Sequence, residues 1–439
     1  VKADISWYEN HKAEKAYAFR NSDELVGLAL LVNETLGVSE SFEGWTLSLE
    51  KDIDLTGVNW IPIGQSNKFA GTFNGNNRNI KGLNAVVTTG YAGLFGNLTG
   101  TVRNLQVEGS VTASGSVTYV GGIVGYNNGG TVQNCLSNVT VNAAAAANKP
   151  VGGVVGQNTG TVNLCWNKGS VIGAGFTGGV VGSGTVTNCA NFGAVTGGTS
   201  YSVGGIAGSG AVANSYNLGD VTGAANMAYG ISNGTVTNSY YICKLNGTEK
   251  MAYVHKTDTK DITYNEADKT YTVGEDAALL VDKLNGENRG GNTPWFVNPA
   301  KGVYLPIHVF TWMGDKDERF EEQTVTVTYY PNGGVNKDGA DEPISVTVTL
   351  MPDTDTGSFA AVSYTILAAD SETLGFQHEN GAFNTWKDRS GNLYAAGSTV
   401  QVSDNITLYA QWYNIWAGTG TESDPYQISN AEKLTALQT

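Results

Sequence analysis

The stretch that decides the fold runs Val151-Gly-Gly-Val-Val-Gly-Gln-Asn-Thr-Gly-Thr-Val-Asn-Leu-Cys165, two short apolar segments joined by a turn. Relatives of its first half begin at Ala92, Val120, Thr177 and Val203. The place of Leu164 is taken in the other copies by Asn104, Asn134, Asn188, Asn214 and Asn238, so neighbouring copies lie 30, 30, 24, 26 and 24 residues apart. A period of this length predicts one supersecondary unit per repeat.

Within each repeat the apolar residues alternate in short runs, as at Val132, Cys135, Val139 and Val141, and Gly or Asn interrupts the runs. Such runs are typical of strands. Because no segment between the copies is long enough for a crossover helix, each copy must form a coil that stacks on the previous one at about 4.8 Å. The sequence therefore predicts an all-β fold, a right-handed parallel β-helix over residues 46–245.

The repeats also predict which residues line up in columns. We expect the glycine pairs 121/122, 152/153, 178/179 and 204/205 at corners where positive φ or close backbone approach excludes a Cβ atom. Cys135, Cys165 and Cys189 fall in register, with Leu105 before them and Ser215 and Ser239 after them. We expect an inward stack of buried free thiols. The alternatives are a disulfide, which parallel side chains pointing the same way would strain, and a thiolate metal site.

The asparagine column beside the cysteines has two interpretations as well. A ladder of hydrogen-bonded amides that closes the turn is the one we favour, and a row of ligand-binding side chains is the alternative.

The repeat resembles the GLUG motif family, through Gly93-Leu94-Phe95-Gly96 and its variants Gly122-Ile123-Val124-Gly125 and Gly153-Val154-Val155-Gly156. The resemblance covers about 92 to 240, and Asp52-Ile-Asp-Leu-Thr-Gly, Trp60-Ile-Pro-Ile-Gly and Phe69-Ala-Gly-Thr-Phe-Asn-Gly are similar to the leading coils of such domains. It implies a large bacterial surface protein, such as an adhesin or the non-catalytic part of a surface protease, and it carries no catalytic residues.

An open β-helix needs a cover at each end. Asn21 and Glu24 form a helix start signal, and we expect a helix from about 22 to 35 over the first coil, within a cap region at 1–45. At the other end, within 246–313, we expect a helix from Asp276 to Leu284 and a closing cluster of apolar residues, namely Trp295, Phe296, Tyr304, Leu305 and Ile307.

After a charged linker the strands become longer, as in Thr324-Val-Thr-Val-Thr-Tyr-Tyr. The block from Phe383-Asn-Thr-Trp386 to Thr407-Leu-Tyr-Ala-Gln-Trp412 is similar to the Listeria-Bacteroides repeat, which implies a small β-grasp-like module at 320–412. Residues 413–439 reproduce the N-terminal cap at a constant offset of 409, for example Trp7 with Trp416 and Asn21 with Asn430. We expect them to be the truncated start of a further β-helix cap.

Catalytic chemistry finds little support in the repeats. Between 84 and 240 the charged residues are Arg103, Glu108, Lys149, Lys168 and Asp220, in different coils and without a histidine. A hydrolase or lyase site needs clustered carboxylates. Asp52 and Asp54 share a strand face and are interpreted as an exposed polar face, and His11, His255, His308 and His378 are scattered. We expect no catalytic, cofactor-binding or metal-binding residues and no cofactor; the ligand-binding residues are unknown.

The formal charge of −15 argues against nucleic acid as a partner, and no apolar run is long enough to span a membrane. Exposed aromatics near the turns could hold a glycan or could simply pack on the next coil, which is the interpretation that we favour; they are Tyr119, Tyr126, Trp166, Phe176, Tyr201, Tyr216, Tyr229, Tyr240 and Tyr241. We expect a non-enzymatic extracellular protein of the bacterial cell surface, an adhesin or stalk with glycans or matrix proteins as partners. The alternatives are a carbohydrate-active β-helix enzyme and a purely structural spacer of a larger surface protease or adhesin.

Overall fold

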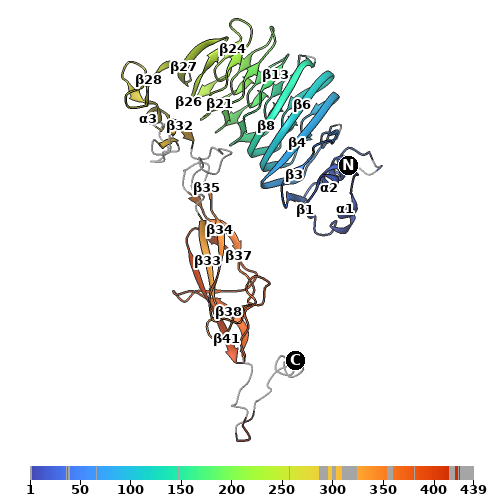
Figure 1. The fold of residues 1–439 in the computed structure, drawn as a ribbon, viewed down its shortest axis with the longest axis vertical. Helices are drawn as coiled ribbons and strands as arrows, with labels where there is room; N and C mark the ends of the chain where they lie inside the picture. The colour runs from blue at the N-terminus through green and yellow to red at the C-terminus, as the bar shows by residue number, and fades with distance from the viewer. Residues whose placement is uncertain are drawn as a thin grey trace. The chain divides into compact units, whose positions relative to one another are not determined.

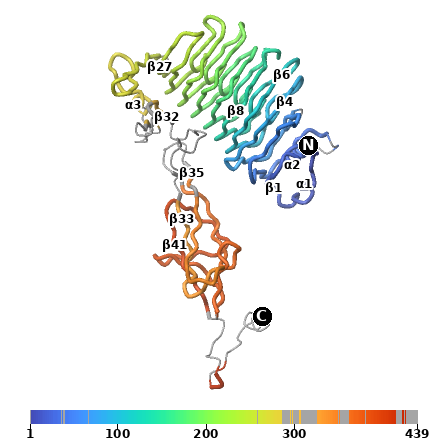
Figure 2. The backbone as a smooth tube through the Cα atoms, in the orientation of Figure 1, coloured from blue at the N-terminus to red at the C-terminus, as the bar shows by residue number. Residues whose placement is uncertain are grey.

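A computed structural model describes residues 2–35, 37, 40–65, 67–146, 148–256, 258–285, 295–298, 303–308, 324–352, 359–379, 381–414, 421–423 and 425. The chain forms two compact units, Val1–Arg319 and Phe320–Thr439. The first unit is a parallel β-helix, as predicted, in which each coil pairs with the coils before and after it (Figure 1). The tube in Figure 2 shows the coils side by side from β4 onwards.

The first full coils carry long, bent strands. β4 (Thr72–Ala92) pairs in parallel with β6 (Thr101–Gly121), and β6 pairs with β8 (Thr131–Ala146). The later coils divide the same path into short strands, which are β9 (Val151–Gly152), β11 (Thr161–Asn163), β12 (Trp166–Asn167), β13 (Val171–Gly173), β14 (Thr177–Gly178), β16 (Val186–Thr187), β17 (Ala190–Asn191), β18 (Val195–Thr196), β19 (Val203–Gly204), β21 (Val212–Ala213), β22 (Tyr216–Asn217), β23 (Val221–Thr222), β24 (Ala228–Tyr229) and β25 (Val236–Thr237).

A second, five-stranded parallel sheet runs along another side of the coils. Its strands are β5 (Phe95–Leu98), β7 (Val124–Asn127), β10 (Val155–Asn158), β15 (Val181–Ser183) and β20 (Ala207–Ser209). Between the sheets lies a core of stacked, fully or almost fully buried side chains. One column contains Val102, Val132, Val162, Val186, Val212 and Val236, which follow from the registers of the paired strands; the pair Asn163 with Thr187 places Val162 beside Val186.

The cysteine column has the predicted inward direction. Cys135, Cys165 and Cys189 are buried free thiols. The backbone N–H of Cys165 donates to Sγ of Cys189 at 3.4 Å, and the N–H of Cys189 donates to Oγ of Ser215 at 3.0 Å. Each small polar side chain therefore accepts the N–H of the preceding coil, which explains why serine can replace cysteine further along the stack.

The asparagine column is a ladder of amides, as favoured from the sequence. Nδ2 of Asn134 donates to Oδ1 of Asn104 at 2.8 Å, and Nδ2 of Asn238 donates to Oδ1 of Asn214 at 3.1 Å. Every member has a positive φ, from 48° at Asn238 to 56° at Leu164. Asparagine tolerates this left-handed conformation better than other residues with a side chain, so the ladder fixes a sharp corner in each coil.

The glycine pairs do not sit at positive φ, which corrects one half of the expectation. None of these glycines has a φ in the left-handed region. The second reason for glycine holds: a Cβ atom on Gly153 would lie 2.2 Å from the backbone oxygen of Gly179 and 2.4 Å from Cγ of Asn167. The pairs are therefore required by close packing between backbone layers, while the left-handed corners belong to the asparagines.

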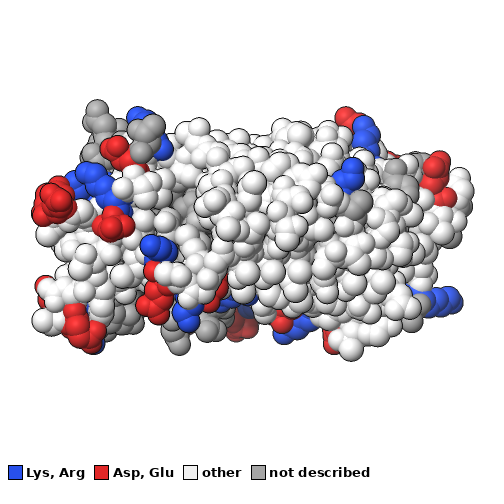
Figure 3. Space-filling view, turned by 90° about the horizontal axis from the view of Figure 1, so that it is seen from above, with Lys and Arg blue, Asp and Glu red and all other residues white. Residues whose placement is uncertain are grey.

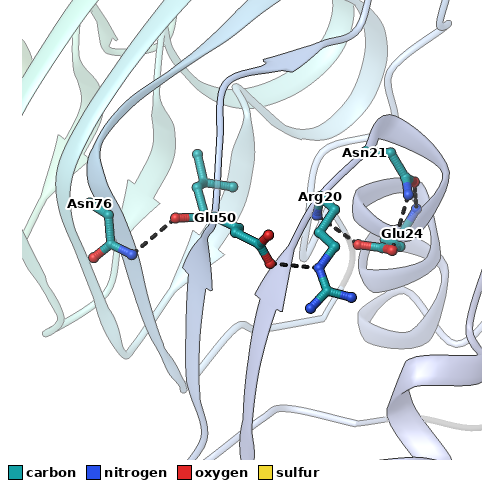
Figure 4. Close-up of polar contacts among 6 residues, drawn as sticks. Arg20, Asn21, Glu24, Glu50 and Asn76 are labelled. Atoms are coloured by element: carbon teal, nitrogen blue, oxygen red, sulfur yellow. Dashed lines mark hydrogen bonds and ion pairs between the residues drawn. The ribbon is translucent and has the colours of Figure 1, made fainter. Parts of the chain in front are cut away.

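The N-terminal end is covered by a cap around α2 (Ser22–Val32), which ends three residues before the expected limit. The side chain of Asn21 accepts from the N–H of Glu24 at 3.0 Å, and a Glu24 carboxylate oxygen accepts from the N–H of Arg20 at 2.7 Å (Figure 4). Arg20 also donates to Glu50. α1 (Ser6–Asn10), β1 (Ala16–Phe19), β2 (Thr46–Leu49) and β3 (Ile53–Asp54) complete this end.

The other end of the coil stack changes from parallel to antiparallel pairing. Successive strands β26 (Ser239–Leu245), β27 (Thr248–His255), β28 (Asp258–Asn265), β29 (Thr270–Val273) and β30 (Ala278–Leu279) form hairpins, followed by α3 (Leu280–Asn285), β31 (Trp295–Asn298) and β32 (Val303–His308). The helix expected from Asp276 begins only at Leu280, because residues 274–279 turn back to pair with β29 and Ala277 has a φ of +49°. Trp295 is buried and Leu305 packs against the same cluster; the side chains of Phe296, Tyr304 and Ile307 lie outside the described residues.

The second unit has a five-stranded sheet in the order β34, β33, β41, β38, β39. Its strands are β33 (Thr324–Tyr330), β34 (Ile344–Thr349), β38 (Gly381–Lys387), β39 (Leu393–Tyr394) and β41 (Ile406–Asn414). β33 and β41 are parallel neighbours and the other pairs are antiparallel. Two small pairs accompany the sheet: β35 (Met351–Pro352) with β36 (Phe359–Ala360), and β37 (Val362–Thr365) with β40 (Thr399–Val402). Of the cap remnant expected at 413–439, the structure describes 413–414, 421–423 and 425, so this expectation lies almost wholly outside the described residues.

Candidate functional site

The candidate binding surface of the first unit lies next to the glycines of the repeat. Gly121 and its counterparts in later coils face the backbone of the second sheet: a Cβ atom on Gly121 would lie 2.8 Å from the N of Gly156, and one on Gly152 would lie 2.7 Å from the N of Gly182. Two backbone layers thus lie back to back with no side chain between them. The residues that precede and follow these closely packed backbone segments therefore lie at the edge of each coil.

At that edge, residues at equivalent positions of successive coils form a column, and most of them are aromatic. Tyr91 is in register with Tyr119. The N–H of Val120 donates to the carbonyl of Pro150 at 3.2 Å, and the N–H of Val151 donates to the carbonyl of Phe176 at 2.8 Å. We call the surface formed by Tyr91, Tyr119, Tyr126, Pro150, Phe176 and Tyr201 the aromatic corner; all six are half-buried.

The rings of the aromatic corner form two groups. In the first, Tyr119 and Tyr126 have ring centroids 5.0 Å apart, and Tyr91 lies 5.9 Å from Tyr119 and 5.7 Å from Tyr126. Partial burial, with smaller effects of Tyr126 and Tyr91, raises the pKa of Tyr119, so its hydroxyl stays protonated at neutral pH. In the second group Phe176 and Tyr201 meet edge to face at 5.1 Å. Pro150 stands in the coil between the two groups.

A polar column lies beside the rings on the second sheet. Tyr126 is in register with Gln157, Gln157 with Ser183, and Ser183 with Ser209. These side chains are half-buried. The corner thus offers apolar ring faces next to an amide and two hydroxyls, which can donate and accept hydrogen bonds.

Three aromatics that the sequence grouped with this stripe are elsewhere. Trp166, Tyr216 and Tyr240 are 0%, 1% and 0% exposed. They form a second core under the C-terminal hairpins, where Tyr216 and Tyr240 stack with centroids 5.3 Å apart. For them the packing interpretation is correct, and they are unavailable to a ligand.

Tyr91 was missed in the sequence although its position carried a signal. It directly precedes Ala92-Gly-Leu-Phe-Gly, as Tyr119 precedes Val120-Gly-Gly-Ile-Val-Gly.

The two remaining aromatics of the predicted stripe also lie apart from the corner. Tyr229 is half-buried and donates to the carbonyl of Asn226 at 3.4 Å, and Tyr241 packs partly on the core.

The titratable side chains considered from the sequence are dispersed. Asp54 accepts from the N–H of Thr56 at 2.8 Å, and the hydrogen bonds from Thr56 lower the pKa of this carboxyl group. Asp52 accepts from the N–H of Asn79 at 3.0 Å. Both carboxylates are thus used by local backbone groups, on an exposed strand face.

The histidines lie apart from one another. Nδ1 of His11 contacts the carbonyl of Trp7 at 2.8 Å, the N–H of Asn238 donates to His255, and the ring of His378 lies 5.4 Å from that of Trp412. The side chain of His308 lies outside the described residues. Across the part of the chain that the structure describes, no group of three or more His, Cys, Asp or Glu side chains could hold a metal ion.

Despite burial, hydrogen bonds from Cys135 and Cys189 lower the pKa of the central thiol of the cysteine column, Cys165, whereas burial dominates at the two outer thiols. Burial raises the pKa of the Cys135 and Cys189 thiols well above the ordinary value. Thiols that stay protonated are poor nucleophiles and poor metal ligands.

Among the described residues, no helix combines the length and the hydropathy needed to cross a membrane.

Comparisons with known proteins give two similarities, and no protein-family model matches the chain. A protein of Evansella cellulosilytica described as a "Putative Gly-rich membrane protein" is 42% identical over 103 residues, which is 21% of this chain and 12% of that protein. The chain therefore spans only a small part of that relative. The crystal structure of "a putative immunoglobulin A1 protease from Bacteroides ovatus" matches with a TM-score of 0.47 and 22% identity, over 68% of this chain and 93% of that one.

Proposed function

We propose that this chain is a non-enzymatic part of an extracellular bacterial cell-surface protein, an adhesin or stalk, and that its aromatic corner binds glycans. The observation that carries the proposal is the pair of ring groups, Tyr91 with Tyr119 and Tyr126, and Phe176 with Tyr201, which remain half-exposed along one corner of a stiff coil stack. The resemblance of the repeats to GLUG motifs and the similarity to a Gly-rich membrane protein support the cell-surface location.

The corner has the chemistry that a sugar chain requires. Sugar rings present apolar C–H faces and polar hydroxyl edges, so a binding surface needs both flat apolar rings and hydrogen-bonding groups. The two ring groups supply the first, and the side chains of Gln157, Ser183 and Ser209 supply the second. Because equivalent groups recur in successive coils at about 4.8 Å, a linear glycan lying along the axis would meet a similar surface repeatedly.

A carbohydrate-active enzyme is the rival reading. Glycoside cleavage uses a pair of carboxylates, and residues 109–219, which contain nearly all of the aromatic corner, include no Asp or Glu. A paired-carboxylate mechanism therefore has no candidates there. We propose further that residues 1–45, 46–245 and 246–313 act together as the binding unit. The Listeria-Bacteroides-like module at 320–412 would serve as a spacer, and 413–439 would open a further cap.

A glycan array probed with the full chain tests this function. The wild type should bind at least one glycan class, and Tyr119→Ala and Phe176→Ala should each weaken that binding. Tyr264→Ala is the matched control, because Tyr264 is a half-buried ring in β28 whose centroid lies 4.7 Å from that of Tyr271, and it lies outside the corner. Absence of binding to every glycan and matrix protein would overturn the binding role and leave the spacer role; cleavage of a bound glycan would overturn the non-enzymatic assignment.

A further inference from the structure

Charge is distributed unevenly along the coil stack. The whole chain has a formal charge of −15, yet between Glu108 and Asp220 its only charged side chains are Lys149 and Lys168. Figure 3 shows a face on which a wide stretch without charged groups separates the charges at the two ends. The middle coils are therefore locally cationic within an acidic protein.

One of the two lysines belongs to the aromatic corner. Lys149 directly precedes Pro150, whose carbonyl accepts from Val120 of the previous coil, and Val151 donates to Phe176 of the next coil. The backbone of Lys149 stacks on Gly175, since a Cβ atom on Gly175 would lie 2.2 Å from the Lys149 carbonyl oxygen. Lys149 therefore lies in the coil between the two ring groups, about 4.8 Å from each neighbouring coil.

The ammonium group of Lys149 is available. The side chain is exposed, and it makes no hydrogen bond or ion pair with any residue that the structure describes. Its charge is therefore not paired within the part of the chain that the structure describes. Lys149 stands in the coil between two ring groups, and residues 109–219 include no Asp or Glu, so no acidic side chain of these coils would repel an anionic group of a ligand.

We infer that the aromatic corner is selective for acidic glycans, with a carboxylate or sulfate group paired to Lys149 and the flanking sugar rings packed on the two ring groups. This inference rests on the proposed function and names the ligand class of the same site. The net charge of −15 opposes it only at long range. Charges beyond about 10 Å are largely screened at 0.1 M salt, and the acidic Glu108 is separated from Tyr119 by half the length of β6.

The experiment compares binding of the full chain to polygalacturonate, to its neutral methyl ester and to dextran sulfate. Polygalacturonate and its ester share one backbone, so their difference isolates the carboxylate, and dextran sulfate tests a sulfate as the source of the anion. Lys149→Met is the test variant. Lys168→Met is the matched control, because it removes the same charge from an exposed side chain that β13 separates from the corner.

We expect the wild type to bind an anionic polymer more tightly than the ester, with affinity that falls as salt rises. Lys149→Met should weaken that binding about fivefold, the upper range for one exposed ion pair, and Lys168→Met should leave it unchanged. Equal binding of the acid and the ester, or equal loss in both lysine variants, would overturn the acidic selectivity while the proposed function stands. Binding to no glycan at all would overturn the proposed function itself.

Discussion

Replacing Gly153 with alanine tests the packing of the coil stack most sharply. The new Cβ atom would lie 2.2 Å from the backbone oxygen of Gly179 and 2.6 Å from Oδ1 of Asn167. Both neighbours would have to shift: the backbone of Gly179, which belongs to the next coil, and the side chain of Asn167. That amide is fully buried and donates to the carbonyl of Gly169 at 2.7 Å and to Oδ1 of Asn191 at 2.8 Å.

The cost has two parts. Overpacking a tight site destabilises by about 1–3 kcal/mol, and leaving a buried amide donor unpaired costs about 1–3 kcal/mol. We therefore expect Gly153→Ala to lower the free energy of unfolding of the first unit by about 2–6 kcal/mol, a large share of the roughly 5–15 kcal/mol of a typical domain. Gly129→Asn is the control, because Gly129 has a φ of +78°, which asparagine tolerates, and no atom lies within 4 Å of its Cβ position.

Urea unfolding followed by hydrogen exchange of peptides from 131–210 measures this effect within the coils, so unfolding of the second unit does not contribute. The Gly153→Ala midpoint should fall well below that of the wild type, and the Gly129→Asn midpoint should stay close to it. Equal midpoints for all three proteins would refute the close backbone approach.

Three further predictions concern the corners, the pH range and metal ions. Leu164→Asn should raise the free energy of unfolding by about 1 kcal/mol, because Leu164 has a φ of 56° and asparagine tolerates this left-handed conformation better. Leu164 is also absent from the main apolar clusters, so little packing should be lost. A lower melting temperature would show that the burial of Leu164 outweighs the backbone strain. Burial raises the pKa of Tyr17 and of Cys243 to about 12 from ordinary values of 10.0 and 9.0. The folded state therefore favours their protonated forms, so the first unit should keep its stability below about pH 9 and lose it progressively towards pH 12; a flat profile in alkaline thermal melts would contradict this. A chelator should leave the melting temperature unchanged, and a marked drop would reveal a bound cation that contributes to stability.

The coil architecture could be predicted because the repeat places equivalent residues in register. The asparagines and the small residues of the cysteine column follow directly from that alignment. For the glycine pairs the sequence suggested two reasons, positive φ and close backbone approach, and only the second holds. A sequence shows where a Cβ atom is excluded and does not show which of the two excludes it. At position 153 the backbone oxygen of Gly179 and the side chain of Asn167 exclude any residue with a Cβ atom.

The aromatic corner could be predicted only in part. Tyr119 and Tyr216 look alike in the sequence, as each lies in a short run of a coil. Their burial differs because the hairpins from β26 to β29 cover the column of Tyr216 and do not cover that of Tyr119. This covering is a tertiary feature set by residues beyond the repeats. The shortened helix α3 has a similar cause, because pairing of β30 with β29 takes the residues that helical spacing assigned to the helix.

A crystal structure of the chain with a bound oligogalacturonate would show directly where the acidic sugar binds. We expect sugar density along the aromatic corner, with rings on Tyr119 and Phe176 and a carboxylate within hydrogen-bond distance of the Lys149 ammonium. Sugar density at any other surface, with the aromatic corner empty and free of lattice contacts, would contradict it.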